Sequence, residues 1–341
     1  MKIVSSEEKG ALPRYPRVTM VIGVVSVLLG VLLLLPGLRS VQVILDRKTG
    51  TAEGMTYTWG LHLSLAPRYE VWAKEWLGSK RGEVLTLDDI SGTEWPLFGS
   101  VFFLEATEAL QAQWKTAGGK TEPMSYARDA VEAATALVLS PSSATWVKRH
   151  WGENYLDQEN AFYRMLLVRA IVAHHHLTGS VEHLEMLRGQ VDGLMREIDA
   201  SPAGLLDDYP HQCYPSDIAA TVAAIRRASA ILGIESTAFV SRAIRGFTGD
   251  NVGRLGLPPY YALRETGQPY DDSRGCSNSY LLLSTPVAWP EQAAKWYGIY
   301  EKHFWQWNWL SAGWREFPHD RGNWLCRNGV WNRCGENEWP L

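Results

Sequence analysis

The sequence lacks the short motifs that mark the best-known enzyme classes. It contains no G-x-G-x-x-G after a strand pattern, no P-loop, no H-E-x-x-H and no G-x-S-x-G. Those motifs build phosphate cradles, zinc sites and serine nucleophiles. Nucleotide-dependent and serine-hydrolase activities therefore have no support, and we expect the protein to use no cofactor.

Cysteine and excess charge are also scarce. None of the 4 cysteines forms a C-x-x-C pair, so a zinc ribbon or a thioredoxin-like motif is not expected. Cys326 and Cys334 could close a short disulfide loop outside the cytoplasm, which the sequence alone does not decide. The net charge of −4 gives no electrostatic reason to expect a nucleic-acid partner.

One long stretch near the start carries no charge at all. The 21 residues 18–38, between Arg17 and Arg39, would span about 30 Å as a helix, which matches a bilayer core. A signal peptide has a shorter apolar region of about 7–15 residues. Because basic residues are slightly more frequent before the stretch, we predict a single-pass anchor, with residues 1–17 cytoplasmic and the main domain extracytoplasmic.

Strand patterns are nearly absent, and helical patterns follow one another from Trp95 onward. We assign residues 39–95 to an irregular, aromatic-rich segment, 96–321 to a helical domain and 322–341 to an irregular tail with Trp and Cys. Helices are predicted at Leu97–Lys115, Pro123–Ser140, Ser142–Gly152, Gln158–Thr178, Val181–Asp199, Ile218–Leu232, Ser236–Phe247, Ser277–Ser284 and Pro290–Trp307, with an extended piece at Leu255–Leu263.

Apolar helices alternate with amphipathic ones along this domain. Gln158–Thr178 is strongly apolar, whereas Val181–Asp199 carries polar residues on one face. Alternation of this kind is typical of stacked helical hairpins whose first helices line a centre. We therefore predict an all-α fold of the α/α-toroid type, with functional residues where loops enter the inner helices.

The densest group of chemically active side chains lies in the segment Gly204–Asp217, directly before a predicted helix. Pro210 and Pro215 exclude helix from the segment. Polar side chains held at a helix start suit acid/base catalysis. In the structural alternative, the acids solvate a loop and Ser216 or Asp217 caps the next helix. The candidate residues are Asp207, Asp208, Tyr209, His211, Cys213 and Tyr214.

Three other segments carry candidate residues. Glu159 and Tyr163 are four positions apart in a predicted inner helix and could project into the same cavity, although Glu159 could instead cap that helix. Asp272 precedes another inner helix and could bind substrate or cap the helix. The segment Gly313–Arg321 joins several ionisable side chains beside a tryptophan cluster, with Trp314, Arg315 and Glu316 as candidate substrate-binding residues.

The run His174–His176 resembles a metal site only at first sight. Consecutive helical residues point about 100° apart, so the three rings cannot converge on one ion. We therefore predict structural histidines and no metal.

Four segments together carry a family resemblance: Gln158–Tyr163, Leu177–Ser180, Tyr209–Cys213 and, more loosely, Gly275–Ser284. Through these motifs and their spacing, residues 95–310 resemble the linalool dehydratase/isomerase family. The resemblance implies an (α/α)6 barrel that forms homo-oligomers. It also implies cofactor-free dehydration and isomerisation of a tertiary monoterpene alcohol. The matched positions are Cys213 on a family active-site cysteine, Tyr209 and Gln212 beside it, and Glu159, Asn160 and Tyr163 on the inner-helix motif.

The chain also departs from that family. Leu166 stands where the family has a histidine, and Asp207 and Asp208 stand in a shorter loop that lacks the family's second cysteine. A six-hairpin ring needs more helix after Trp309, yet residues 322–341 show no helical period. Either the ring is incomplete, or the chain ends early relative to its relatives.

These observations favour a membrane-anchored hydro-lyase or isomerase acting on a small, apolar, terpenoid-like alcohol. Asp207 or Asp208 would act as acid, with Cys213 or His211 as base. The rival is a carbohydrate-active glycosidase or epimerase with a carboxylate pair such as Asp208 and Glu316. A third hypothesis is an inactive binding module of the same fold.

Overall fold

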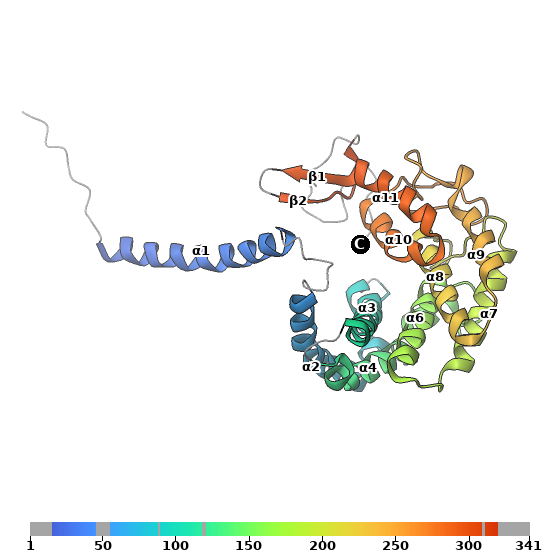
Figure 1. Ribbon diagram of the computed structural model, residues 1–341, viewed down its shortest axis with the longest axis horizontal. Helices are drawn as coiled ribbons and strands as arrows, with labels where there is room; N and C mark the ends of the chain where they lie inside the picture. Colours follow the sequence, from blue (N-terminus) through green and yellow to red (C-terminus); the bar gives the residue numbers. More distant parts are fainter. Residues whose placement is uncertain (1–15, 46–54, 88, 118–120, 309–310, 320–341) are drawn as a thin grey trace, which may run out of the picture. The chain divides into compact units, whose positions relative to one another are not determined.

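A computed structural model describes the chain except residues 1–15, 46–54, 88, 118–120, 309–310 and 320–341. The prediction of an all-α protein is confirmed, because most described residues are helical (Figure 1). The chain divides into two compact units, Met1–Leu61 and His62–Leu341. Cys326, Cys334 and the predicted tail 322–341 lie outside the described residues.

The first unit contains helix α1, Pro16–Leu45, and the start of helix α2, Met55–Ser79. Large apolar side chains of α1, from Met20 to Leu38, are exposed. Within the part of the chain whose placement is described, we find no helix with the length and apolarity needed to cross a membrane.

The prediction of an irregular segment at 39–95 is wrong. Helix α2 lies inside it, and α3 already begins at Ile90 and runs to Ala117. A single face explains α2: Ala66 and Ala73, seven positions apart, are fully buried in the hydrophobic core. The charges between them and Pro67 inside the helix obscure this period in the sequence.

The remaining helices confirm most of the predicted ones, with shifts at their ends. Proline occupies the first position of α4, α8 and α11, where the missing N–H costs nothing. The left-handed residues Gly179 and Gly233 end α6 and α8. The bounds are α4 Pro123–Leu139, α5 Thr145–Trp151, α6 Ala161–Thr178, α7 Leu184–Ala200, α8 Pro215–Leu232, α9 Thr237–Ala243, α10 Gly275–Ala288 and α11 Pro290–Phe304, with short 3-10 turns at Arg81–Glu83, Ile244–Phe247 and Gly249–Asn251.

The last helix is shorter than predicted. It ends at Phe304, and strand β1, Trp305–Asn308, follows at once. This strand pairs antiparallel with β2, Ser311–Trp314, in the register Trp305 opposite Trp314. The segment predicted as a loop from Gly313 therefore begins inside a hairpin, which suits its aromatic residues.

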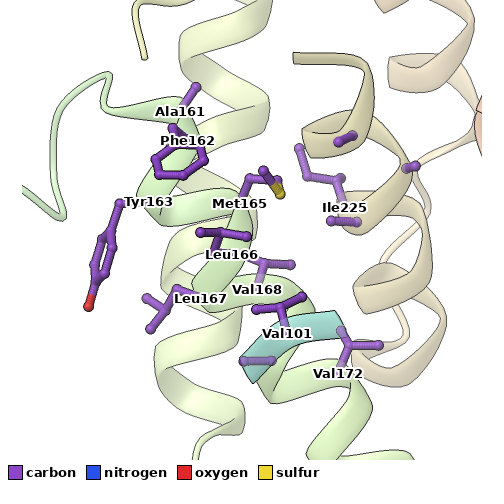
Figure 2. Close-up of a cluster of buried hydrophobic side chains, with 14 of the residues drawn as sticks. Val101, Ala161, Phe162, Tyr163, Met165, Leu166, Leu167, Val168, Val172 and Ile225 are labelled. Carbon is purple, nitrogen blue, oxygen red and sulfur yellow. The ribbon is translucent and has the colours of Figure 1, made fainter. Parts of the chain in front are cut away.

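Four helices lie side by side in the order α3, α6, α8 and α10, and a second set covers them (Figure 1). Helix α4 packs on α3 and α6, α7 on α6 and α8, and α11 on α10. Helix α6 is buried on all sides from Ala161 to His174. Figure 2 shows Met165, Val168 and Val172 on the side of α6 that faces Ile225 of α8.

The four inner helices run in the same direction. The loop before α8 reaches the first turn of α3, where Tyr209 bonds to Glu94. Halfway along, Arg169 of α6 bonds to Glu105 of α3. At the far end, Arg226 of α8 donates to the carbonyl of Ala288, the last residue of α10. The loops that enter these helices therefore gather at one end of the domain.

Candidate acid/base site

The loop before α8 is a tight hairpin held together by its own aspartates. Asp207 Oδ2 accepts a hydrogen bond from the backbone N–H of His211 at 2.9 Å, and Asp208 Oδ2 accepts one from the N–H of Tyr214 at 2.7 Å. His211 adopts a positive φ of 65° at the turn and is exposed. Both predicted acids thus have a structural task. Asp208 Oδ1, by contrast, is buried without a hydrogen-bond partner among the described residues.

The side chain of Tyr209 extends from this loop into the interior of the domain. Its hydroxyl donates to Glu94 Oε1 at 2.5 Å. Its ring lies among aromatic side chains, with centroids at 6.0 Å from Trp146, 5.5 Å from His150 and 6.0 Å from Phe162. A carboxyl group of α3 is therefore tied to the predicted loop inside an aromatic shell.

Asp217 completes the group, although the sequence alone offers it as a helix cap. Helix α8 begins at Pro215, its N-cap Tyr214 makes no side-chain capping bond, and Asp217 lies inside the first turn. The residue is half-buried, and its carboxyl group is surrounded by protein atoms. The pKa of Asp217 is raised to about 7, mainly by burial and then by the negative charge of Glu94, while the positive charge of Arg169 opposes the shift.

The neighbouring carboxyl groups share this property. Burial raises the pKa of Asp208 well above its usual value, and the charge of Asp217 adds to the effect. Burial also raises the pKa of Glu94, while the hydrogen bond from Tyr209 opposes the shift. Like charges in a poorly solvated site cannot all ionise, so protonated and ionised carboxyl groups coexist near neutral pH. That combination supplies both an acid and a base.

Cys213 lies next to these groups but is unsuited to the predicted role of base. Its side chain is buried, and its carbonyl accepts from the N–H of Ala262 at 3.1 Å. Burial raises the pKa of the thiol well above its usual value, and the charge of Asp208 raises it further. The thiol therefore stays protonated. His211, the other predicted base, points its backbone into the turn and lies at the surface.

The predicted pairing of Glu159 with Tyr163 is wrong. Helix α6 begins only at Ala161, so the two residues do not share a helical face. Glu159 Oε2 accepts from the N–H of Asp207 at 2.9 Å, and its other oxygen pairs with Arg264 at 2.5 Å. Tyr163 extends from a different side of α6 than Met165 (Figure 2), and its hydroxyl donates to the carbonyl of Val138 at 3.0 Å. Tyr163 therefore fixes α4 to α6.

The other predicted substrate-binding residues form a second group at the start of α10. Glu316 accepts from both the N–H and the thiol of Cys276, at 3.0 and 3.1 Å. Trp314 stacks on Tyr300 with centroids 4.5 Å apart. The rest of this group is linked as follows: Asp272 to Arg254 at 2.8 Å, Arg315 to His319 at 2.9 Å, and Tyr214 edge-on to Tyr260 and Tyr261 at 5.3 and 5.6 Å.

This arrangement bears on the predicted carbohydrate-active pair. Both oxygens of Glu316 are occupied by Cys276. Asp208 is only 1% exposed. A retaining or inverting pair must flank a sugar from two open carboxyl groups, and these two residues do not offer that.

Below the carboxyl groups, the inner helices enclose aromatic and charged side chains. Phe98 of α3 contacts Phe162 at 5.0 Å and Tyr280 of α10 at 5.9 Å. Arg169 donates to both Glu105 and Tyr280. A cavity of about 310 Å³ lies beside Arg169 between α3, α8 and α10, and alanines form much of its wall, whereas Asp217 and Glu94 do not line it. The four helices thus leave room for a small molecule in the centre.

The histidine run behaves as its spacing predicts. The three rings contact three separate partners: His174 contacts Glu132, His175 contacts the carbonyl of Ser180, and His176 contacts Glu108. Among the residues that the structure describes, no group of three His, Cys, Asp or Glu side chains could hold a metal ion.

Comparison with protein-family models and with curated proteins gives no match for this chain. The site's geometry therefore carries the functional argument on its own.

The raised pKa of Asp217 makes stability depend on pH. A carboxyl group with a pKa near 7 in the fold and 3.8 in the unfolded chain stabilises the fold fully below about pH 4. This stabilisation is lost as the pH rises through 7. We expect the free energy of unfolding to fall by roughly 2 kcal/mol between pH 5 and pH 7 through this group. Urea titrations should show a smaller fall for Asp217→Asn, and an equal fall would contradict the assignment.

Proposed function

We propose that this protein is a cofactor-free acid/base enzyme, a hydro-lyase or isomerase that acts on a small, apolar, terpenoid-like alcohol. The observation that carries the proposal is the group of buried carboxyls where the loop before α8 meets α3: Asp217, whose pKa is raised to about 7, interacts electrostatically with Glu94. Among the residues that the structure describes, none forms a hydrogen bond with the Asp217 carboxyl oxygens, so its proton is available to a ligand.

The proposed reaction needs two proton transfers. Protonated Asp217 donates its proton to the hydroxyl of the substrate, the carbon–oxygen bond breaks, and water leaves. Ionised Glu94 then removes a proton from the adjacent carbon, and the electron pair of that bond forms the alkene. The reverse sequence adds water at a different carbon and gives an isomerised alcohol.

The surroundings support a substrate with little polarity. Phe98, Phe162 and Tyr280 lie next to the carboxyl groups, and Met165 lies 3.6 Å from the hydroxyl of Tyr280. Aromatic walls exclude water, which protects a carbocation-like intermediate and strengthens electrostatic interactions. A sugar would need several more polar partners than this wall offers.

The proposal keeps two expectations from the sequence. Stacked pairs such as α6 with α7 support an (α/α)-toroid of the kind implied by the linalool dehydratase/isomerase resemblance. The homo-oligomer implied by that resemblance belongs to the same proposal. The role of the family's active-site cysteine differs in this proposal. Cys213, which stands at that position, holds the loop through its backbone carbonyl, and the carboxyl groups transfer the protons.

We also propose that residues 18–38 hold the protein at a membrane with the main domain outside the cytoplasm. The 21-residue uncharged stretch supports the membrane anchor, and the slightly more frequent basic residues before it support the orientation. Protease added to intact cells should degrade the main domain and spare a tag at the N-terminus. Protection of the main domain would refute the orientation.

Product analysis tests the function. Purified protein would be incubated with short tertiary and allylic alcohols and with alkenes, and the products separated by gas chromatography. We expect an alkene or an isomerised alcohol with the wild type. Turnover of none of these compounds, together with release of sugar from a glycoside panel, would overturn the proposal in favour of the carbohydrate-active rival.

A further inference from the structure

A second pocket lies between the C-terminal half of α2 and the start of α3. Its volume is about 290 Å³, and Trp72, Trp76 and Trp95 form its apolar walls. None of these residues takes part in the acid/base site. Among the described residues that line it, Asp89 is negatively charged and Arg81 positively charged.

The position of the indoles follows from the helix period. Tyr69, Trp72 and Trp76 stand at i, i+3 and i+7 of α2, so they share one face. Their rings follow one another with centroids 5.5 Å and then 5.9 Å apart. Trp95 enters from the first turns of α3. Trp72 is 38% exposed and Trp95 63%, so large aromatic surfaces stay open to solvent at this pocket.

The two charged groups are fixed in place by different contacts. Asp89 Oδ1 accepts from the hydroxyl of Ser91 at 2.7 Å and from the N–H of Gly92 at 3.0 Å, which holds the carboxylate at the start of α3. The guanidinium carbon of Arg81 lies 5.7 Å from the centroid of the Trp76 ring. This contact places a cation over the face of the Trp76 indole, an arrangement favoured by the ring's negative face.

We propose that this pocket binds a phosphocholine group, with its trimethylammonium against Trp72 and Trp95 beside Asp89, and its phosphate at Arg81. Quaternary ammonium groups are recognised by aromatic cages, in which tryptophan is the most effective ring. Arginine binds phosphate through paired, charge-assisted hydrogen bonds. The site is independent of the proposed enzymatic function.

The charge pattern favours a zwitterion over simpler ligands. A plain cation would meet the positive charge of Arg81, and a plain anion would meet the negative charge of Asp89. A phosphocholine group carries both charges a few atoms apart and complements both side chains at once.

The test is a calorimetric titration of the full-length protein in a polyoxyethylene detergent, with phosphocholine as the probe. We expect saturable binding of phosphocholine, weaker binding of choline and no binding of inorganic phosphate. Dihexanoyl phosphatidylcholine, below its micellar concentration, then identifies the source. Tighter binding of this lipid than of phosphocholine indicates that the natural ligand is a lipid headgroup. Binding of phosphocholine without binding of the lipid indicates that the natural ligand is the free metabolite. Failure of both to bind would overturn the proposal.

Four variants test whether phosphocholine binds in this pocket. Trp72→Ala, Trp95→Ala and Arg81→Gln should each weaken phosphocholine binding about tenfold. Asp89→Asn should do the same while still capping α3, because asparagine caps as well as aspartate. The matched control is Trp305→Ala, since Trp305 is 39% exposed and lies in β1.

Two results would contradict the assignment: equal weakening by Trp305→Ala, or unchanged binding in Arg81→Gln and Asp89→Asn. Should Trp72→Ala fail to fold, Trp72→Phe replaces it. Phenylalanine keeps a ring between Tyr69 and Trp76 but attracts a cation less strongly. Unchanged binding in Trp72→Phe and Trp95→Phe would equally overturn the cage.

Discussion

Replacing Asp217 with asparagine is expected to lower kcat by about 10²–10⁴-fold, because general acid catalysis contributes that much and an amide cannot donate the proton. The substitution keeps the size and shape of the side chain. Its carboxyl group makes no capping or side-chain hydrogen bond within the described part of the chain, so the fold should persist. The measurement is the rate of alkene or isomer formation by gas chromatography.

A matched control separates this effect from a general loss of charge. Asp192 is an exposed aspartate of α7, far along the chain from the carboxyl group at the start of α8. Asp192→Asn should keep wild-type kcat. Activity of Asp217→Asn within a few-fold of the control would exclude Asp217 as the proton donor.

Replacing Arg164 with methionine is expected to lower the free energy of unfolding by about 3–5 kcal/mol. Arg164 is 1% exposed and binds Glu197 of α7 at 2.8 Å and Gln190 at 2.8 Å. It also donates to the carbonyl of Glu159, next to the loop that carries the site. The substitution leaves the buried Gln190 amide and the partly exposed Glu197 carboxylate without their partner, which costs more than the lost attraction.

Gly193 supplies an independent check. A Cβ atom there would lie 2.7 Å from Arg164 Nη2, so Gly193→Ala should destabilise the wild type but be tolerated beside Arg164→Met. Urea titration of the two single variants and the double variant measures this coupling. The exposed Arg196 of α7 is the control, and Arg196→Met should change stability by less than about 0.5 kcal/mol. Equal losses for Arg164→Met and Arg196→Met would contradict the account.

Helices with clear starts and stops were predictable from the sequence. Pro123 and Pro290 begin helices, and Gly179 and Gly233 end them, at or near the predicted positions. Pro215 was expected to exclude helix, but it begins α8 three residues before the predicted start. These residues act through local backbone preferences, which need no knowledge of the rest of the fold.

Helix α2 and the early start of α3 could not be predicted from such local backbone preferences. Pro67 and Pro96 lie inside these helices, where proline ordinarily argues against a helix. The packing of Ala66 and Ala73 into the core outweighs that local penalty. Tertiary contacts of this kind have no signature in a short stretch of sequence.

The candidate site was predictable only in part. The sequence identified the loop with Asp208 and Tyr209 but missed Glu94, because the segment around it looked irregular. It also treated Asp217 as a cap. One signal was available: with Pro215 as the first helical residue, Asp217, Ala220 and Ala224 form one stripe along α8. The structure places Ala220 and Ala224 on the wall of the central cavity.

The loop itself illustrates the limit of spacing arguments. Glu159 and Tyr163 are four residues apart, yet the left-handed Asn160, with φ 43°, separates them into a loop and a helix. A single positive φ at a non-glycine residue is held in place by its surroundings, here by its bond to the carbonyl of Tyr155. The sequence gives no sign of it.

The central claim is that Asp217 holds a proton near neutral pH, and infrared titration tests it most directly. Difference spectra of wild type minus Asp217→Asn would be recorded from pH 4 to pH 9 in the carboxylic-acid band. The account predicts a protonated carboxyl band that disappears with a midpoint near pH 7 and that only the wild type shows. Absence of any carboxyl group that titrates above about pH 5, the range of ordinary aspartates, would contradict it.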